Sequence, residues 1–163
     1  MADRRTIYRI THERYADDPF SGKGGLQYRS RWASKGQLVS YASAHLATAI
    51  LEKIAGVHRA DLLTEMVYVK AEVEPNHVEV LPNEELPADW DALPPNSAPR
   101  EVGDRWLADR DHLLLRVPAV VLPDCYNYVI NAGHPDVEAL AVVETAPLLL
   151  DNRVLRQVGA EPS

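Results

Sequence analysis

Several features that would mark other classes of protein are scarce or missing in this sequence. Its 163 residues include a single cysteine, Cys125, so no disulfide can form within the chain. No apolar run approaches the length of a membrane span, and residues 1–5 are not followed by the apolar core of a secretory signal. We therefore expect a cytoplasmic protein that has no membrane partner.

Positive charge and metal ligands are also in short supply. The 17 lysines and arginines are outnumbered by 24 acidic residues, which gives a net charge of −7. Binding to a nucleic-acid backbone needs a basic surface, so we expect no direct nucleic-acid partner. None of the six histidines stands at helical ligand spacing from another, and the sequence has no Cys–His cluster, so no metal site is predicted.

The most informative segment that is present is a predicted helix over residues 44–56, with Ser43 as its N-cap and Gly56 at its end. Its apolar side chains form one wide stripe, which consists of Leu46, Ala47, Ile50, Leu51 and Ile54. Glu52 lies on the flank of this stripe beside small side chains, and no basic residue stands three or four positions away to pair with it. Such a carboxylate is a candidate for binding a ligand; the alternative is a solvated glutamate at the edge of the helix.

The residues before this helix supply further candidate groups. Side chains alternate in type along residues 28–32 and again along residues 38–41, which predicts two strands around a turn at Lys35-Gly36. An arginine, a tyrosine and Glu52 would then come from two adjacent strands and the helix that follows. This trio suits a dinucleotide, because arginine binds phosphate as a fork, tyrosine can stack on a nicotinamide ring and glutamate can stabilise positive charge at the anomeric carbon.

Three other polar residues are weaker candidates. Asn127 and Asn131 either close polar turns near the site or satisfy backbone groups at strand ends. His45 lies on the same helix flank as Glu52, where it either borders a pocket or is exposed on the surface.

At this point the sequence resembles a known family, the RES domain. The likeness covers roughly residues 7–155 and rests on the order and spacing of short stretches. These stretches are Tyr8-Arg9-Ile10, Ser30-Arg31-Trp32 with Gly36, Tyr41-Ala42-Ser43, Ala49-Ile50-Leu51-Glu52, Leu86-Pro87-Ala88-Asp89-Trp90, Gly103-Asp104-Arg105-Trp106-Leu107, Val117-Pro118, Asn127-Tyr128-Val129-Ile130-Asn131, His134-Pro135 and Asp151-Asn152-Arg153-Val154.

The resemblance implies the toxin of a type II toxin–antitoxin pair, with a fold related to ADP-ribosyltransferases and NAD as its substrate. The family's functional residues map onto Arg9, Arg31, Tyr41 and Glu52. Arg31, Tyr41 and Glu52 are implied to be catalytic, and all four residues to bind NAD. The implied partners are an Xre-type helix-turn-helix antitoxin and a cellular protein that accepts ADP-ribose.

Two departures from the family pattern bear on the reaction. Ser30 stands where the family usually has glycine, and Ala119 stands where it usually has serine after Val-Pro. If the missing serine hydroxyl holds a water or a phosphate, its loss favours transfer of ADP-ribose to a protein. The alternatives are an NAD hydrolase or phosphorylase, and a RES-like binding module that has lost activity.

The remaining pattern predicts one α+β domain over residues 1–163, with antiparallel sheets and a few helices. A short helix is expected over residues 100–108, the proline-rich residues 74–99 are expected to be irregular, and residues 156–163 to form a flexible tail. Further strands are expected over residues 7–11, 66–73, 113–121, 128–132, 139–144 and 148–155.

Overall fold

A computed structural model describes residues 3–56 and 63–159 of the chain. These residues form a seven-stranded sheet with the strand order β4-β5-β6-β2-β1-β3-β7. All neighbouring strands are antiparallel except β4 and β5. The strands are β1 (Arg5–His12), β2 (Val39–Ser43), β3 (Met66–Val73), β4 (Val78–Val80), β5 (Leu114–Pro118), β6 (Tyr126–Asn131) and β7 (Ala141–Pro147).

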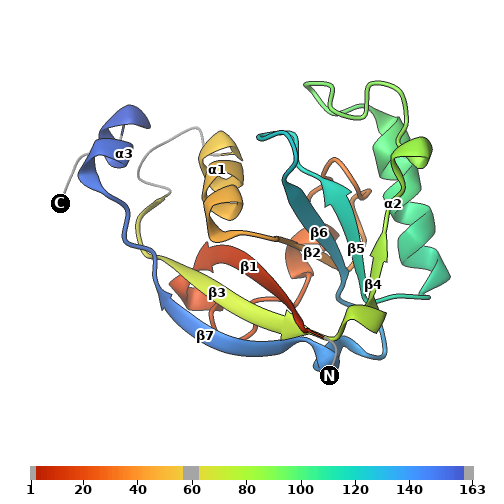
Figure 1. The fold of residues 1–163 in the computed structure, drawn as a ribbon, viewed down its shortest axis with the longest axis horizontal. Coiled ribbons are helices and arrows are strands. Elements are labelled where there is room, and N and C mark those ends of the chain that lie inside the picture. Colours follow the sequence, from red (N-terminus) through yellow and green to blue (C-terminus); the bar gives the residue numbers. More distant parts are fainter. Residues whose placement is uncertain (1–2, 57–62, 160–163) are drawn as a thin grey trace.

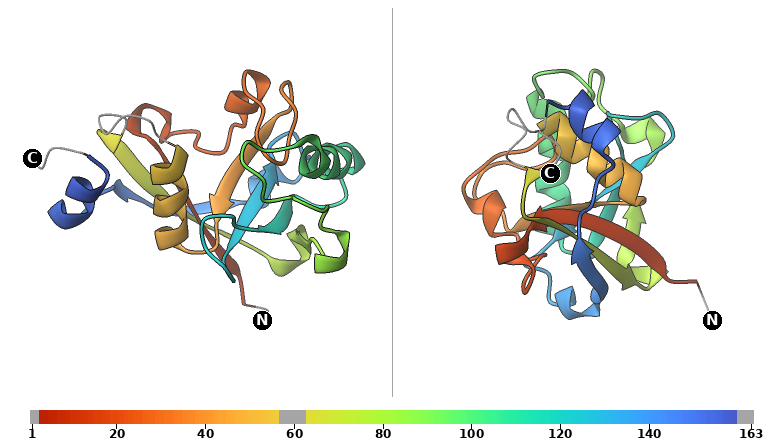
Figure 2. Two further views of the ribbon diagram at one scale, coloured as in Figure 1. Left: turned by 90° about the horizontal axis from the view of Figure 1, so that it is seen from above. Right: turned by 90° about the vertical axis from the view of Figure 1, so that its left-hand side faces the viewer.

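Three helices accompany the sheet: α1 (Leu46–Gly56), α2 (Ser97–Asp109) and α3 (Asn152–Gln157). Helix α1 lies over β1 and β2, whereas α2 lies toward the β4 and β5 end of the sheet (Figure 1). Seen from above, α1 and α2 stand apart, with β2, β6 and β5 between them (Figure 2). The arrangement therefore leaves the strands between the two helices without a helix over them (Figure 2).

Strand β3 matches the predicted residues 66–73, because its side chains alternate cleanly. Val67, Val69, Ala71 and Val73 point to one face and are all buried. The strand pairs with β1 along its whole length, from Arg5 opposite Val73 to His12 opposite Met66. Burial of apolar side chains favours folding, so this face stabilises the β1–β3 pair, and α1 packs against β1.

The predicted start of α1 is wrong. Ser43 is the last residue of β2 rather than an N-cap, and its hydroxyl donates to Asn127 instead of to the helix. Only part of the predicted apolar stripe packs against the core: Leu46 and Ile50 do so, whereas Ala47 is exposed and Leu51 is 38% exposed. Thr48 and Ala49 are the buried residues of the helix, so its small-residue flank, which carries Glu52, faces the sheet.

The strand predicted over residues 28–32 does not form. This segment docks on α2 instead: the backbone of Trp32 approaches Gly103 so closely that a Cβ there would lie 1.6 Å from the Trp32 carbonyl oxygen. Ser34 adds two hydrogen bonds, from its backbone N–H and its hydroxyl, to the carboxylate of Asp104. Contacts with a helix thus replace the strand pairing that the alternation of side chains suggested.

Two further differences lie near the proline-rich segment and the C-terminus. Residues 74–99 contain the short strand β4, which pairs in parallel with β5. The strand expected over residues 148–155 does not form. Residues 152–155 belong to helix α3 instead, because the Asp151 carboxylate accepts the backbone N–H of Arg153 and so caps a helix. Of the expected tail, residues 156 and 157 belong to α3, and residues 160–163 lie outside the described part of the chain.

Candidate active site

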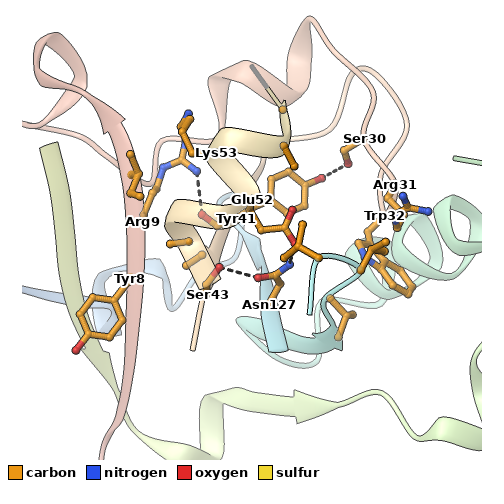
Figure 3. Close-up of a pocket in the computed structure, with 18 of the residues that line it drawn as sticks. Tyr8, Arg9, Ser30, Arg31, Trp32, Tyr41, Ser43, Glu52, Lys53 and Asn127 are labelled. Carbon is orange, nitrogen blue, oxygen red and sulfur yellow. Dashed lines mark hydrogen bonds between the residues drawn. The ribbon is translucent and has the colours of Figure 1, made fainter. Parts of the chain in front are cut away.

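A pocket of about 560 Å³ opens between α1 and the strands β1, β2, β5 and β6. Its size is typical of small-molecule sites. The four residues singled out in the sequence, Arg9, Arg31, Tyr41 and Glu52, all line this pocket (Figure 3). They come from β1, the segment before β2, β2 itself and α1, so the fold brings together side chains that are up to 43 positions apart in the sequence (52 − 9).

Glu52 is held by a chain of hydrogen bonds that crosses three elements. The Ser43 hydroxyl of β2 donates to the Asn127 side-chain oxygen of β6 at 2.6 Å, and the Asn127 amide donates to Oε1 of Glu52 at 2.7 Å. Ser43 and Asn127 are partners in the β2–β6 register, which places the amide opposite the helix. The sequence named Asn127 only as a weaker candidate; in the structure it positions the carboxylate.

Tyr41 is fixed at both its backbone and its side chain. Its phenol is hydrogen-bonded to the hydroxyl of Ser30, the residue that replaces the family's usual glycine. Its carbonyl oxygen accepts a hydrogen bond from Nη1 of Arg9 at 2.9 Å. Burial raises the pKa of Tyr41, so the ring is a neutral phenol with a defined orientation.

Arg31 has a structural contact as well as a place in the pocket. Its Nη1 donates to the carbonyl oxygens of Trp90 at 2.7 Å and Ala92 at 2.9 Å. Trp90 in turn stacks on Trp32, with the ring centroids 6.2 Å apart. Burial lowers the pKa of Arg31, while nearby Glu52 opposes that shift. A guanidinium has five N–H groups, so Arg31 still has donors for a ligand.

Arg9 and Lys53 form a second group of charges in the pocket. Burial lowers the pKa of Arg9, and its Nε is buried without a hydrogen-bond partner. Burial, and then the charge of Arg9, lower the pKa of Lys53. The sequence analysis missed Lys53, because the neighbour that suggests a role for it, Arg9, lies on another element and is distant in the sequence.

Some expected pocket residues lie elsewhere. Within the described part of the chain, Ala119 is not among the residues that line the pocket, although its neighbours Pro118 and Val120 are. Ala119 is buried, and its backbone N–H donates to the Cys125 carbonyl oxygen at 2.8 Å. His45 is exposed, and Asn131 donates to the carbonyl oxygen of Leu107 away from the pocket. In this structure Ala119 is therefore buried next to the pocket and is not one of the residues that line it.

The described residues contain neither a candidate metal site nor a helix that could span a membrane. Residues 3–56 and 63–159 contain no group of three His, Cys, Asp or Glu side chains that could hold a metal ion. None of the helices in these same residues is long and apolar enough to cross a membrane.

Comparisons with known proteins agree on one family. The family model described as the RES domain matches residues 6–151. The chain is 26% identical over 151 residues to a "Toxin Res" of Photorhabdus laumondii, covering 92% of this chain and 97% of that protein. It is 31% identical over 147 residues to a "Prs ADP-ribosylating toxin" of a Sphingobium species, covering 88% and 91%.

Comparison with solved structures gives the same fold. The toxin–antitoxin complex MbcT–MbcA of M. tuberculosis contains a chain that matches with a TM-score of 0.67 and 17% identity. The match covers 97% of this chain and 90% of that one. At this level of identity the likeness concerns the fold alone, and it confirms the expected α+β class.

Proposed function

The chain belongs to the RES domain family, and from this we propose that it is a toxin that cleaves NAD and transfers the ADP-ribose unit to a cellular protein. The observation that carries the proposal is the Glu52 carboxylate, held by Asn127 in a pocket that also contains Tyr41, Arg31 and Arg9. A fixed carboxylate beside an aromatic ring and two guanidinium groups matches the chemical parts of NAD.

The proposed reaction breaks the bond between the nicotinamide nitrogen and the ribose anomeric carbon. Nicotinamide leaves with the bonding electron pair, and positive charge develops on the ribose. Glu52 stabilises that charge, and because Asn127 already orients the carboxylate, little reorganisation is needed during the reaction. The acceptor nucleophile then bonds to the anomeric carbon and gives up its proton to the solvent.

The other residues of the proposed site bind the substrate. Tyr41 offers its ring to the nicotinamide, since its hydroxyl is already engaged by Ser30. Arg31 and Arg9 bind the pyrophosphate with the N–H groups that the protein leaves unused.

A protein acceptor is favoured by the likeness to the Sphingobium toxin, whose name states that it ADP-ribosylates Prs. Position 119 no longer adds to this preference, because Ala119 does not line the pocket. NAD degradation with water or phosphate as acceptor fits the same residues and is the second candidate. The match to a toxin from a toxin–antitoxin complex supports an antitoxin partner for this chain, which we propose to be of the Xre type.

The decisive experiment is to incubate the purified protein with labelled NAD and a cell lysate. A labelled protein band indicates transfer, whereas free ADP-ribose or its phosphate indicates degradation. The Glu52→Gln variant should lose most of its activity in either case, and Glu101→Gln, the same change at an exposed helical site, should behave as the parent. If the folded parent consumes no NAD, the chain is a binding module and the enzymatic proposal is wrong.

A further inference from the structure

One end of the pocket carries two positive charges for which the described part of the chain shows no ion pair. Arg9 from β1 and Lys53 from α1 both line the cavity and lie beside each other, on the other side of Glu52 from Arg31 (Figure 3). Both side chains are half-buried. Like charges brought together away from water raise the free energy of the folded protein unless an opposite charge joins them.

Residues 3–56 and 63–159 supply no ion-pair partner for the charges of Arg9 and Lys53. Glu52, the carboxylate that lines the pocket with them, accepts a hydrogen bond from Asn127 and acts electrostatically on Arg31. The Nε of Arg9 remains buried without a partner, and a buried donor in that state costs free energy.

We infer that Arg9 and Lys53 together form an anion subsite for phosphate groups, in which Lys53 is a binding residue. The identity of the phosphate as part of NAD rests on the proposed function; the subsite itself rests on the two unbalanced cations and the cavity they line. A phosphate or pyrophosphate provides the missing negative charge and several acceptor oxygens.

The competing explanation is that Lys53 only packs its alkyl chain against the sheet and keeps its ammonium group in water. The two explanations differ in what removal of the charge does. A packing role predicts unchanged ligand binding in Lys53→Met, which keeps an apolar side chain of similar length. An anion subsite predicts weaker binding of phosphate-containing ligands in the same variant.

The test is isothermal titration calorimetry on the full-length parent, Lys53→Met, Lys53→Arg and the control Lys35→Met, whose lysine is exposed on a turn. The probes are ADP-ribose, inorganic pyrophosphate and inorganic phosphate. Lys53→Met should bind ADP-ribose and pyrophosphate with a Kd at least about 10-fold higher, because one hydrogen bond to a charged group is lost. Lys53→Arg should keep most of the affinity, and Lys35→Met should match the parent.

The probes also separate the two sources of phosphate. If only binding of inorganic phosphate weakens in Lys53→Met, the subsite stands but its occupant is free phosphate rather than the dinucleotide. Unchanged binding of all three probes would overturn the inference. The proposed function is tested apart from this, since a protein that binds pyrophosphate through Lys53 yet consumes no NAD would retain the subsite and lose the enzymatic role.

Discussion

The two ends of the pocket are built in opposite ways. At the carboxylate end, formed by Ser43, Asn127 and Glu52, hydrogen bonds link each side chain to the next. At the cationic end, formed by Arg9 and Lys53, two like charges lie together and one buried donor has no partner. The first arrangement is complete without a ligand, as expected of a group that must be rigid during chemistry. The second becomes favourable only when an anion arrives, as expected of a binding group.

The largest effect should follow from neutralising the carboxylate end. Glu52→Gln keeps the size of the side chain but removes the negative charge that stabilises the transition state. We expect kcat to fall on the order of 100-fold or more, as for the loss of other preorganised electrostatic groups. The measurement is NAD turnover by purified protein, with Glu101→Gln as control and thermal melts to verify folding. Turnover at the parent rate would remove Glu52 from the mechanism.

The next effect tests whether Asn127 acts through Glu52. Asn127→Ala removes the amide that orients the carboxylate. In the variant the Glu52 side chain must therefore be brought into its reactive orientation during the reaction. We expect kcat to fall by about 10-fold while KM changes little, because one hydrogen bond to a charged group is lost. The exposed Asn83→Ala is the matched control. In the background of Glu52→Gln the Asn127→Ala change should cost much less, and full additivity of the two effects would contradict the positioning role.

A smaller effect should separate the ring of Tyr41 from its hydroxyl. Tyr41→Phe loses the bond to Ser30 but keeps the ring, whereas Tyr41→Ala loses the stacking surface as well. A neutral hydrogen bond is worth about 1 kcal/mol, so Tyr41→Phe should raise KM by less than about 10-fold and Tyr41→Ala by more. Ser30→Gly should resemble Tyr41→Phe, and the double variant should be no worse than either. Equal losses in Tyr41→Phe and Tyr41→Ala would assign the function to the hydroxyl.

The sequence mainly predicted features that depend on neighbouring residues, and it missed those that depend on residues distant in the chain. Strand β3 follows from a period-2 pattern that is local, and Glu52 stands out because its helix offers no partner. Residues 28–32 have a similar pattern but lie on α2, because Gly103 lets the Trp32 backbone approach closely, and no local signal shows this. Asp151 starts a helix that the alternation of neighbouring residues concealed.

The roles of Lys53 and Asn127 could not be predicted for the same reason. Each depends on a neighbour that is distant in sequence, Arg9 for Lys53 and Glu52 for Asn127. The family resemblance supplied Arg9, Arg31, Tyr41 and Glu52 as candidates, and the fold gathers them in one pocket, but their roles remain proposals that the variants above test.

Position 119 should affect stability but not the choice of acceptor. Ala119 is buried outside the pocket, so a serine hydroxyl there would be taken out of water without an assigned partner. The expected cost is about 1–3 kcal/mol of stability, with an unchanged ratio of labelled protein to free ADP-ribose. Thermal melts and product analysis of Ala119→Ser give both quantities. A change in the product ratio at unchanged stability would return this position to the active site.

The smallest effect concerns the stability cost of the cationic end. Lys53→Met removes a charge that burial and Arg9 disfavour, so the ligand-free variant should melt slightly higher than the parent at pH 7, by about 2 °C. A residue that merely packs would give no such gain. The charged and titratable side chains that line the pocket with Lys53 are Tyr8, Arg9, Arg31, Tyr41 and Glu52.

The pH dependence of that gain has a defined sign. Because the pKa of Lys53 is lower in the folded protein than its usual value of 10.5, the unfolded chain binds more protons between these two pKa values. The free energy of unfolding of the parent therefore rises with pH between the two pKa values of Lys53. Below both values, the charged ammonium group destabilises the folded protein by its full amount. Arg9 stays charged at these pH values, and the raised pKa of Tyr41 keeps its phenol neutral to a higher pH than usual. The advantage of Lys53→Met should thus be largest near pH 7 and shrink toward pH 10. If the difference in melting temperature between Lys53→Met and the parent grows with pH, the ammonium group is stabilised in the folded protein. The cationic end would then need no anion to balance its charge.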